Sequence, residues 1–261
     1  MDISGKHVVI TGAAQGIGLA LARRFRRAGA RALILADLDE VQLRIAAAEV
    51  GGTAVRCDVA AEPEVRQLID CAQEQSGPID LFCSNAGIAL GDPDRNNAAS
   101  SPNEDFERCW QVHVMAHVYA ARALLPSMVA RRQGYLLNTV SAAGLLSQIG
   151  SATYSATKHA AIGFAEHLAI THKDQGIKVL VLCPQAVRTR MIGAEPEKGS
   201  AAVDGIITPE ELAECVLEGL KSERFLILPH PAVLEYMRGK TQDYDRWIAG
   251  MARLRQKLNA V

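Results

Sequence analysis

The chain has 261 residues, of which 49% are hydrophobic and 22% charged, and its formal net charge is −1. These values are typical of a globular protein. They exclude a nucleic-acid-binding domain of the usual strongly basic kind. The first residues lack the apolar core of a signal peptide, and no apolar run approaches the ~20 residues that span a bilayer. The six cysteines show no CxxC or zinc-like spacing. We therefore expect a cytoplasmic protein with free core cysteines and no metal site.

Short apolar runs alternate with segments of helical spacing along the whole chain. The apolar runs predict buried strands at 7–10, 32–36, 53–57, 79–83, 134–140, 177–182 and 225–228. The helical spacing predicts helices at 19–28, 39–48, 62–75, 103–132, 154–173 and 209–220. This alternation, without internal repeats, predicts one doubly wound, Rossmann-like α/β domain over residues 1–261. We expect about seven parallel strands, helices on both faces, and a ligand at the carboxyl ends of the strands.

A glycine-rich turn, residues 11–18, connects the first predicted strand to the first predicted helix and reads Thr-Gly-Ala-Ala-Gln-Gly-Ile-Gly. A strand, a glycine-rich turn and a helix in this order are the context of a dinucleotide site. We expect Gly12 to allow the tight turn, and Gly16 and Gly18 to let the backbone approach a pyrophosphate at the helix amino terminus. Plain turns also use glycine, so this motif alone is weak.

The second predicted strand ends at Asp37. An acidic residue at this point of a dinucleotide fold binds the adenosine ribose hydroxyls and repels the additional phosphate of NADP. Leu38, Ala13 and Ala14 supply no cation for that phosphate. The sequence therefore favours NAD. The alternative is that Asp37 merely caps the helix predicted at 39–48.

Tyr154 and Lys158 are four residues apart on a predicted helix, so they lie on one face of it. An ammonium beside a phenol favours the phenolate, and we expect it to lower the pKa of Tyr154. Such pairs are common on ordinary surface helices. Here, however, Ser141 lies 13 positions upstream of Tyr154, directly after an apolar run, and Asn85-Ala86-Gly87 follows another.

Together these motifs resemble the short-chain dehydrogenase/reductase family over roughly residues 3–230. The resemblance implies that Tyr154 is the acid or base, that Ser141 binds the substrate oxygen, and that Lys158 assists Tyr154 and holds the nicotinamide ribose. It also implies that the NAD site is formed by Gly12, Gln15, Gly16, Ile17, Gly18, Asp37, Leu38, Asp58, Val59, Asn85, Ala86, Gly87, Tyr154, Lys158, Pro184, Val187 and Thr189.

The implied function is hydride transfer between NAD(H) and a secondary alcohol or ketone, with oxidation as the preferred direction. The apolar residues Leu145, Leu146, Met191 and Ile192 lie in the loops expected to form the substrate site, so a hydrophobic substrate of cyclic or steroid-like shape is predicted. Two alternatives remain open. One is a carbonyl or 3-oxoacyl reductase that works mainly in the reducing direction, and the other is a catalytically weak NAD-binding protein.

Two residues depart from the family pattern. Gln185 stands where the family usually has glycine, and His113 where it commonly has an asparagine that holds a water near the lysine. His113 is therefore a fourth candidate catalytic residue, since imidazole both donates and accepts hydrogen bonds. The alternative is a core histidine bound to a neighbouring carbonyl. A metal site with His117 lacks a third ligand.

The remaining expectations concern the periphery. Residues 190–207 are predicted to form a substrate lid. Residues 229–261 are predicted to form an amphipathic tail that docks on the domain or on a partner subunit. The helix at 154–173 is rich in small residues, and with the helix at 103–132 it is expected to form the contacts of a homo-oligomer, a tetramer or a dimer. The alternative is that these small residues pack on the protein's own sheet.

Overall fold

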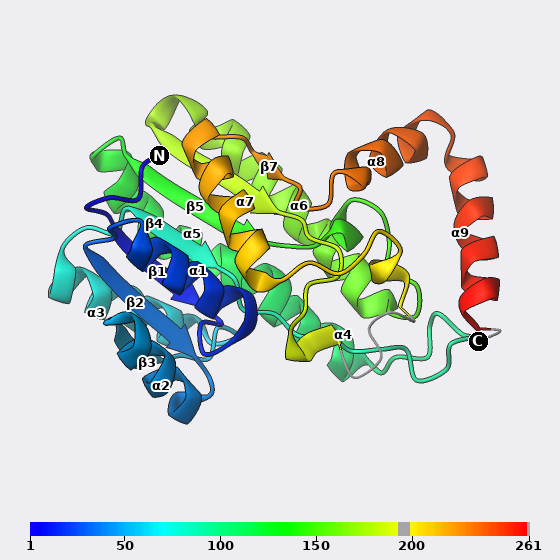
Figure 1. Cartoon of the computed structure of the whole chain (residues 1–261), viewed down its shortest axis with the longest axis horizontal. Helices are drawn as coiled ribbons and strands as arrows, with labels where there is room; N and C mark the ends of the chain where they lie inside the picture. The colour runs from blue at the N-terminus through cyan, green and yellow to red at the C-terminus, as the bar shows by residue number, and fades with distance from the viewer. Residues whose placement is uncertain (193–198, 260–261) are drawn as a thin grey trace.

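A computed structural model describes the chain at residues 1–192 and 199–259. Seven parallel strands form one sheet in the order β3-β2-β1-β4-β5-β6-β7 (Figure 1). Their bounds are β1 His7–Thr11, β2 Ala32–Asp37, β3 Thr53–Arg56, β4 Leu81–Ser84, β5 Gly134–Thr139, β6 Ile177–Leu182 and β7 Leu226–Ile227. The predicted doubly wound sheet is confirmed.

The helices cover both faces of this sheet, as Figure 1 shows. The described helices are α1 Gly16–Arg27, α2 Glu40–Val50, α3 Glu62–Ser76, α4 Asn103–Trp110, α5 Ala116–Ala130, α6 Ala152–His172, α7 Pro209–Ser222, α8 Ala232–Gln242 and α9 Tyr244–Asn259. Apolar residues of α1, α2 and α7 pack in one hydrophobic cluster, and those of α3, α5 and α6 in a second cluster. Both faces of the central strands are therefore buried, which explains why these strands read as continuous apolar runs.

The strand order reverses between β1 and β4, which are neighbours in the sheet although two strand–helix units separate them in the chain. Parallel strands all end at the same edge, so the turns after β1 and β4 meet there. A crevice at such a reversal is where ligands of doubly wound sheets bind. The fold thus brings the glycine-rich turn beside Asn85-Ala86-Gly87.

The helix predicted at 103–132 is divided in the structure. A π-helical turn, η1 at Gln111–Met115, separates α4 from α5. Such turns insert one residue into the helical ladder and are frequent at functional sites. In this protein the turn contains His113 and contacts α6, where His113 Nδ1 lies 2.8 Å from Thr157 Oγ1 near the beginning of the helix. Helical periodicity alone does not reveal it, because the apolar spacing continues across it.

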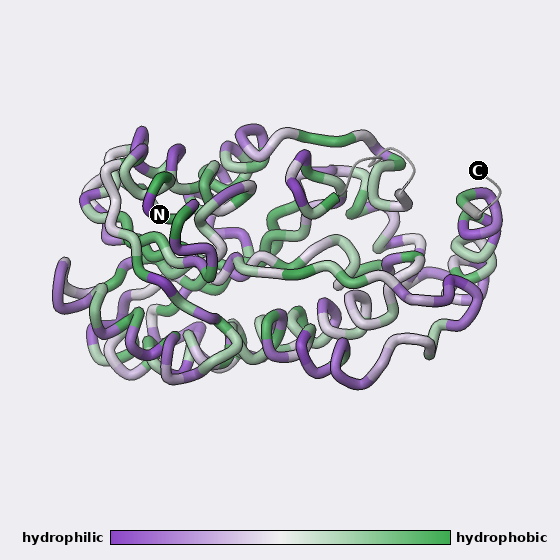
Figure 2. The backbone as a smooth tube through the Cα atoms, turned by 90° about the horizontal axis from the view of Figure 1, so that it is seen from below, coloured by the Kyte–Doolittle hydropathy of each residue, from purple (hydrophilic) through white to green (hydrophobic). Residues whose placement is uncertain are grey.

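The tail forms two helices, α8 and α9, rather than the one predicted. In both Figure 1 and Figure 2 the α9 helix stands at the end of the molecule, away from α2 and α3. Its hydrophobic and hydrophilic residues alternate along the helix (Figure 2). Tyr244 and Ile248 are each 54% exposed, so only part of the apolar surface of α9 is covered.

The small residues of α6 face two ways. Ala161 and Ala165 are buried in the core on the protein's own sheet, as the alternative interpretation expected, whereas Ala156 and Gly163 are exposed. The predicted lid at 190–207 is described only in part, and residues 193–198 lie outside the described residues.

Candidate active site

The glycine-rich turn follows β1 and closes against the turn after β4. Gly12 adopts a φ of 64°, and a Cβ there would lie 2.8 Å from the Cα of Ala86. Only glycine satisfies both demands. A Cβ on Gly18 would lie 2.2 Å from the carbonyl oxygen of Gly12. The absence of a side chain at Gly18 therefore lets α1 pack on the turn, and its predicted approach to a pyrophosphate stays a prediction.

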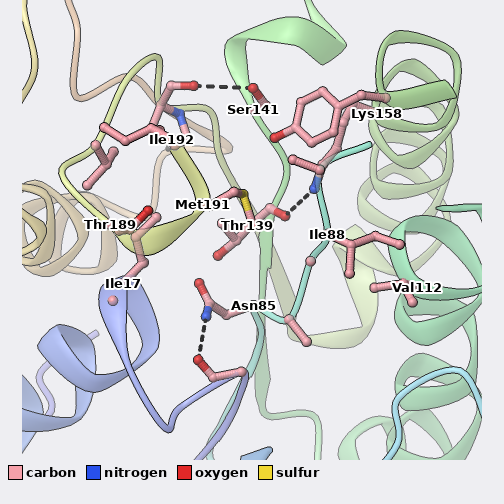
Figure 3. A pocket seen from close by; sticks show the side chains of 18 of the residues that line it. Ile17, Asn85, Ile88, Val112, Thr139, Ser141, Lys158, Thr189, Met191 and Ile192 are labelled. Atoms are coloured by element: carbon pink, nitrogen blue, oxygen red, sulfur yellow. Dashed lines mark hydrogen bonds between the residues drawn. The ribbon is translucent and has the colours of Figure 1, made fainter. Parts of the chain in front are cut away.

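Thr11, which the motif analysis did not single out, connects the two turns. Its Oγ1 accepts hydrogen bonds from the amides of Asn85 at 3.0 Å and Ala86 at 3.2 Å. The Asn85 side chain in turn donates to the Thr11 carbonyl at 3.1 Å. Asn85 therefore connects the two turns, and it also lines the cavity (Figure 3).

Asp37 lies at the end of β2, beside the glycine-rich turn. One carboxylate oxygen accepts from the Ala14 amide at 3.0 Å, and the other accepts from the Asp39 amide at 3.1 Å. The cap of α2 is Asp39, whose side chain accepts from the Gln42 amide. The alternative interpretation of Asp37 as the helix cap is thus wrong. Its carboxylate lines the cavity next to Leu38.

Ser141 lies two residues after the end of β5, on the loop that leads to α6. Its Oγ accepts from the Ala143 amide at 3.1 Å and donates to the Pro184 carbonyl over a long 3.4 Å. Figure 3 shows Ser141 on the same side of the cavity as Lys158. Because the bond to Pro184 is long, the hydroxyl proton is available to a better acceptor.

Lys158 is 3% exposed, and its Nζ donates to the Thr139 carbonyl at 3.3 Å (Figure 3). Burial lowers the pKa of Lys158 to about 8. Its ammonium lies 5.4 Å from the centre of the Tyr154 ring. The helical spacing therefore places the pair on one face of α6, as predicted.

The expected electrostatic effect on Tyr154 is not observed. Burial raises the pKa of Tyr154, and a hydrogen bond with Ser141 opposes the rise only in part. The physical reason is that Lys158 approaches the face of the ring and binds Thr139, whereas loss of water around the hydroxyl disfavours the phenolate.

His113 is fully buried in η1, and both of its ring nitrogens are engaged. Nδ1 lies 2.8 Å from Thr157 Oγ1 on α6, and Nε2 lies 2.9 Å from the Ile88 carbonyl. Burial, followed by the charge of Lys158, lowers the pKa of His113 to about 2. The ring is therefore neutral and bound to a neighbouring carbonyl, and it does not line the cavity.

The departure at Gln185 is accommodated by the carboxyl-terminal segment. The Gln185 amide donates to Nδ1 of His230 at 3.2 Å, and His230 is 3% exposed. The family glycine is thus replaced by a residue whose backbone is held by a buried histidine 45 positions later in the chain. Nothing in the local sequence at Gln185 indicates that partner.

One cavity of about 830 Å³ collects nearly all of the predicted residues. Every predicted cofactor residue except Gly18 lines it, together with Ser141. Met191 and Ile192 also line it, facing Ile88 and Val112 across the space (Figure 3). Leu145 and Leu146 do not line it, so their predicted role in the substrate site is wrong. Lining residues that the sequence reasoning missed include Ile88, Arg108, Val112, Gln148 and Ile149.

Known proteins resemble this chain over nearly its full length. The chain is 36% identical over 255 residues to 1-deoxy-11-beta-hydroxypentalenate dehydrogenase of Streptomyces exfoliatus, covering 95% of this chain and 92% of that protein. It is 32% identical to epidermal retinol dehydrogenase 2 of Mus musculus, covering 87% and 75% of the two chains. A short chain dehydrogenase/reductase from Burkholderia phymatum, solved in complex with NAD, superposes with a TM-score of 0.84 at 28% identity, covering 94% and 96%.

The model of the short chain dehydrogenase family matches residues 6–199, which include the glycine-rich turn, Ser141, Tyr154 and Lys158. The match therefore spans both the part of the cavity lined by the glycine-rich turn and the end where Ser141 and Tyr154 lie. The chain belongs to the short chain dehydrogenase family and is an oxidoreductase that acts on CH–OH groups.

Proposed function

We propose that this protein is an NAD-dependent dehydrogenase in which Ser141, Tyr154 and Lys158 act on a hydrophobic secondary alcohol. The observation that carries the proposal is their convergence, with the glycine-rich turn and Asp37, on one cavity. The proposal assigns no catalytic contact to His113, which lies behind the cavity wall.

The cavity fits a dinucleotide. Gly12 and Gly16 line the cavity at the amino terminus of α1, and Asp37 offers carboxylate oxygens at the end of β2. Asp58 and Val59 would lie at the adenine end, and Pro184, Val187 and Thr189 at the nicotinamide end. Leu38 follows Asp37 in the cavity lining, and no Lys or Arg lies beside them among the described lining residues. A 2′-phosphate would therefore meet a carboxylate without a cation, which favours NAD over NADP.

When bound, NAD supplies hydride transfer chemistry at its nicotinamide ring. The protein's own part is to handle the proton. Tyr154, as phenolate, takes the proton of the substrate hydroxyl while hydride leaves the carbon that bears this hydroxyl. In reduction the phenol returns the proton to the substrate oxygen. Ser141 donates a hydrogen bond to the substrate oxygen and stabilises its developing charge. Lys158, with its pKa at about 8, is mainly protonated at neutral pH and would hold the nicotinamide ribose from the same face of α6 as Tyr154.

The walls of the substrate end support a hydrophobic, cyclic alcohol. Ile88, Val112, Ile149, Met191 and Ile192 line this end of the cavity. Two relatives are named for cyclic alcohol or retinol oxidation. A steroid-like substrate remains one member of this class. We propose that residues 190–207 cover this end as a lid.

A turnover assay tests the function. NAD is offered with a panel of cyclic, steroid and linear secondary alcohols, and NADH with the corresponding ketones and 3-oxoacyl thioesters. We expect cyclic alcohols to give the highest kcat/KM. A preference for 3-oxoacyl thioesters would favour the reductase alternative, and binding of NAD without turnover of any substrate would favour the NAD-binding protein.

We further propose a homo-oligomer, a tetramer or a dimer, acting in the cytoplasm, with residues 1–261 as one domain. Ala156, Gly163 and Ile170 lie seven residues apart on α6, and all three are exposed. Ile170 is 74% exposed, which leaves an apolar side chain in water unless another surface covers it. Light scattering tests this proposal, and a monomer mass at every concentration would overturn it. None of the described helices has the length and apolar character to cross a membrane.

A further inference from the structure

Lys240, in the last turns of α8, is a buried lysine that does not line the cavity. Only 6% of its surface is exposed. Its Nζ donates to the carbonyls of Leu145 and Leu146, each at 2.9 Å, and lies 3.3 Å from Nε2 of His159. All three N–H groups of the ammonium thus have an acceptor. Among the described residues no carboxylate forms an ion pair with it.

The hydrogen bond of Nδ1 shows which ring nitrogen of His159 can accept from Lys240. Nδ1 lies 2.8 Å from the Ser155 carbonyl. A carbonyl only accepts, so Nδ1 carries the proton, and the lone pair of Nε2 is directed at Lys240. The rings of Trp247 and Tyr244 on α9 lie 4.8 Å and 5.5 Å from Nζ and offer their negative faces. An unpaired buried ammonium is costly, and these contacts compensate for the loss of water.

The two carbonyls belong to the loop between β5 and α6, which begins at Ser141. Farther along this loop Gln148, Ile149 and Gly150 line the substrate end of the cavity. The loop is also held to α6, since the Gln148 amide donates to Ser155 Oγ at 2.8 Å. Lys240 therefore binds the loop midway between the residue that contacts the substrate oxygen and the residues that form the wall.

The same helix pair contacts the two other segments around the substrate end. Nη2 of Arg255 on α9 donates to the Arg95 carbonyl at 2.7 Å and to Asn96 Oδ1 at 2.9 Å, in the loop after β4. The Tyr236 hydroxyl on α8 donates to Asp204 at 2.8 Å, in the segment after β6. The helices α8 and α9 thus contact all three loops that surround the substrate end. Of the side chains on α8 and α9 that make these contacts, Lys240 is the buried one.

We propose that Lys240 is a positioning residue for substrate binding: from α8 it fixes the Leu145 and Leu146 carbonyls and so sets the substrate wall of the cavity. The proposal deepens the function proposed above and rests on it for the kinetic readout only. Lys240 does not contact the cofactor half of the cavity, so its loss acts on the substrate and spares NAD.

The test compares wild type with Lys240→Met, which keeps the length of the side chain and removes its charge and donors. Lys257→Met is the matched control, because Lys257 is exposed on α9 and forms no hydrogen bond to the described residues. Hydrogen–deuterium exchange is measured on peptides that cover 141–151 and, as internal reference, the glycine-rich turn at 11–18. NAD affinity and the kcat and KM for the best alcohol are measured alongside.

We expect Lys240→Met to speed exchange at 144–150 by about tenfold or more, as loss of charged hydrogen bonds implies. The KM for the alcohol rises by about the same factor, more than kcat falls, while NAD affinity stays within about twofold. Lys257→Met matches wild type. Lys240→Arg, which keeps the cation, recovers part of the effect.

The proposal is overturned if Lys240→Met exchanges at 144–150 at the wild-type rate. It is also overturned if exchange in Lys240→Met speeds up by the same factor at 144–150 and at the reference peptide 11–18. If Lys240→Met does not fold, Lys240→Arg is measured in its place and must exchange faster than wild type at 144–150. His159→Leu, which removes one of the three acceptors of Nζ, must then show wild-type exchange at 144–150 and an unchanged KM. If the wild-type enzyme turns over no alcohol, the proposed function fails, and the exchange and NAD measurements still decide the role of Lys240.

Discussion

The rings of His113 and Tyr154 meet edge to face, with centroids 5.4 Å apart and planes at 83°. His113 also bonds Thr157, which lies between Tyr154 and Lys158 on α6. The histidine thus connects η1 to the helix that carries the pair, and to the backbone at Ile88 on the cavity wall. From these contacts we infer a positioning role for His113, in place of the titrating group that the sequence allowed.

His113→Ala is expected to lower kcat by about tenfold or more and to leave NAD affinity nearly unchanged, because the ring braces Tyr154 and not the dinucleotide. His113→Asn, which keeps donor and acceptor atoms, is expected to retain much of the activity. Since the pKa of His113 is about 2, the ring stays neutral at pH 6–9 and the shape of the pH–rate profile should not change. Steady-state kinetics across that range check this, and an alanine variant with wild-type kcat would reduce His113 to packing.

Acid is expected to destabilise the fold through His113 and its neighbour His117. His117 is 3% exposed, its Nδ1 lies 2.7 Å from Ser84 Oγ, and burial lowers its pKa to about 3. Both folded-state pKa values lie below the ~6.5 of an unfolded histidine. The unfolded chain therefore binds more protons below pH ~6.5, and stability present above that pH is lost as pH falls toward the folded values. Each histidine contributes a slope of about 1.4 kcal/mol per pH unit in this window.

Urea unfolding of wild type and His117→Asn at pH 5, 6 and 7 measures this linkage. The variant should lose part of the slope between pH 5 and 6. An unchanged slope would show that His117 is not the group that takes up the proton.

Tyr154→Phe should reduce turnover by roughly 10²–10⁴-fold, the usual contribution of a positioned acid or base. Only the hydroxyl is removed, so NAD should bind as in wild type. Fluorescence titration of NADH provides the binding control. Turnover near the wild-type rate would remove Tyr154 from the mechanism.

Asp37 should make the enzyme prefer NAD over NADP by at least about tenfold in kcat/KM, or ~1.4 kcal/mol. Asp37→Ala should narrow this preference, although it also leaves the Ala14 amide without its acceptor. Asp37→Asn is the matched variant, because it keeps an oxygen acceptor and removes the charge. Equal kcat/KM of the wild type with both cofactors would contradict the assignment.

The sequence by itself determined the features that depend on near neighbours in the chain. Buried parallel strands need apolar residues on both faces, so the strands were visible as continuous runs. The tight turn at Gly12, where φ is positive, and the placement of Tyr154 and Lys158 on one helix face are likewise local properties. Even the alternative for His113, a ring bound to a nearby carbonyl, could be stated from the residue type alone.

Tertiary structure alone decided which distant groups meet. Lys240 binds carbonyls 94 and 95 positions earlier, and His230 holds the amide of Gln185. Leu145 and Leu146 have apolar side chains, yet it is their backbone carbonyl oxygens that accept the hydrogen bonds of Lys240. The pKa of Tyr154 followed the same rule, since burial by the whole fold raises it and the lysine one turn away does not lower it. Backbone acceptors and desolvation leave no trace in the pattern of side chains, because every residue has a carbonyl and burial is set by all surrounding elements together.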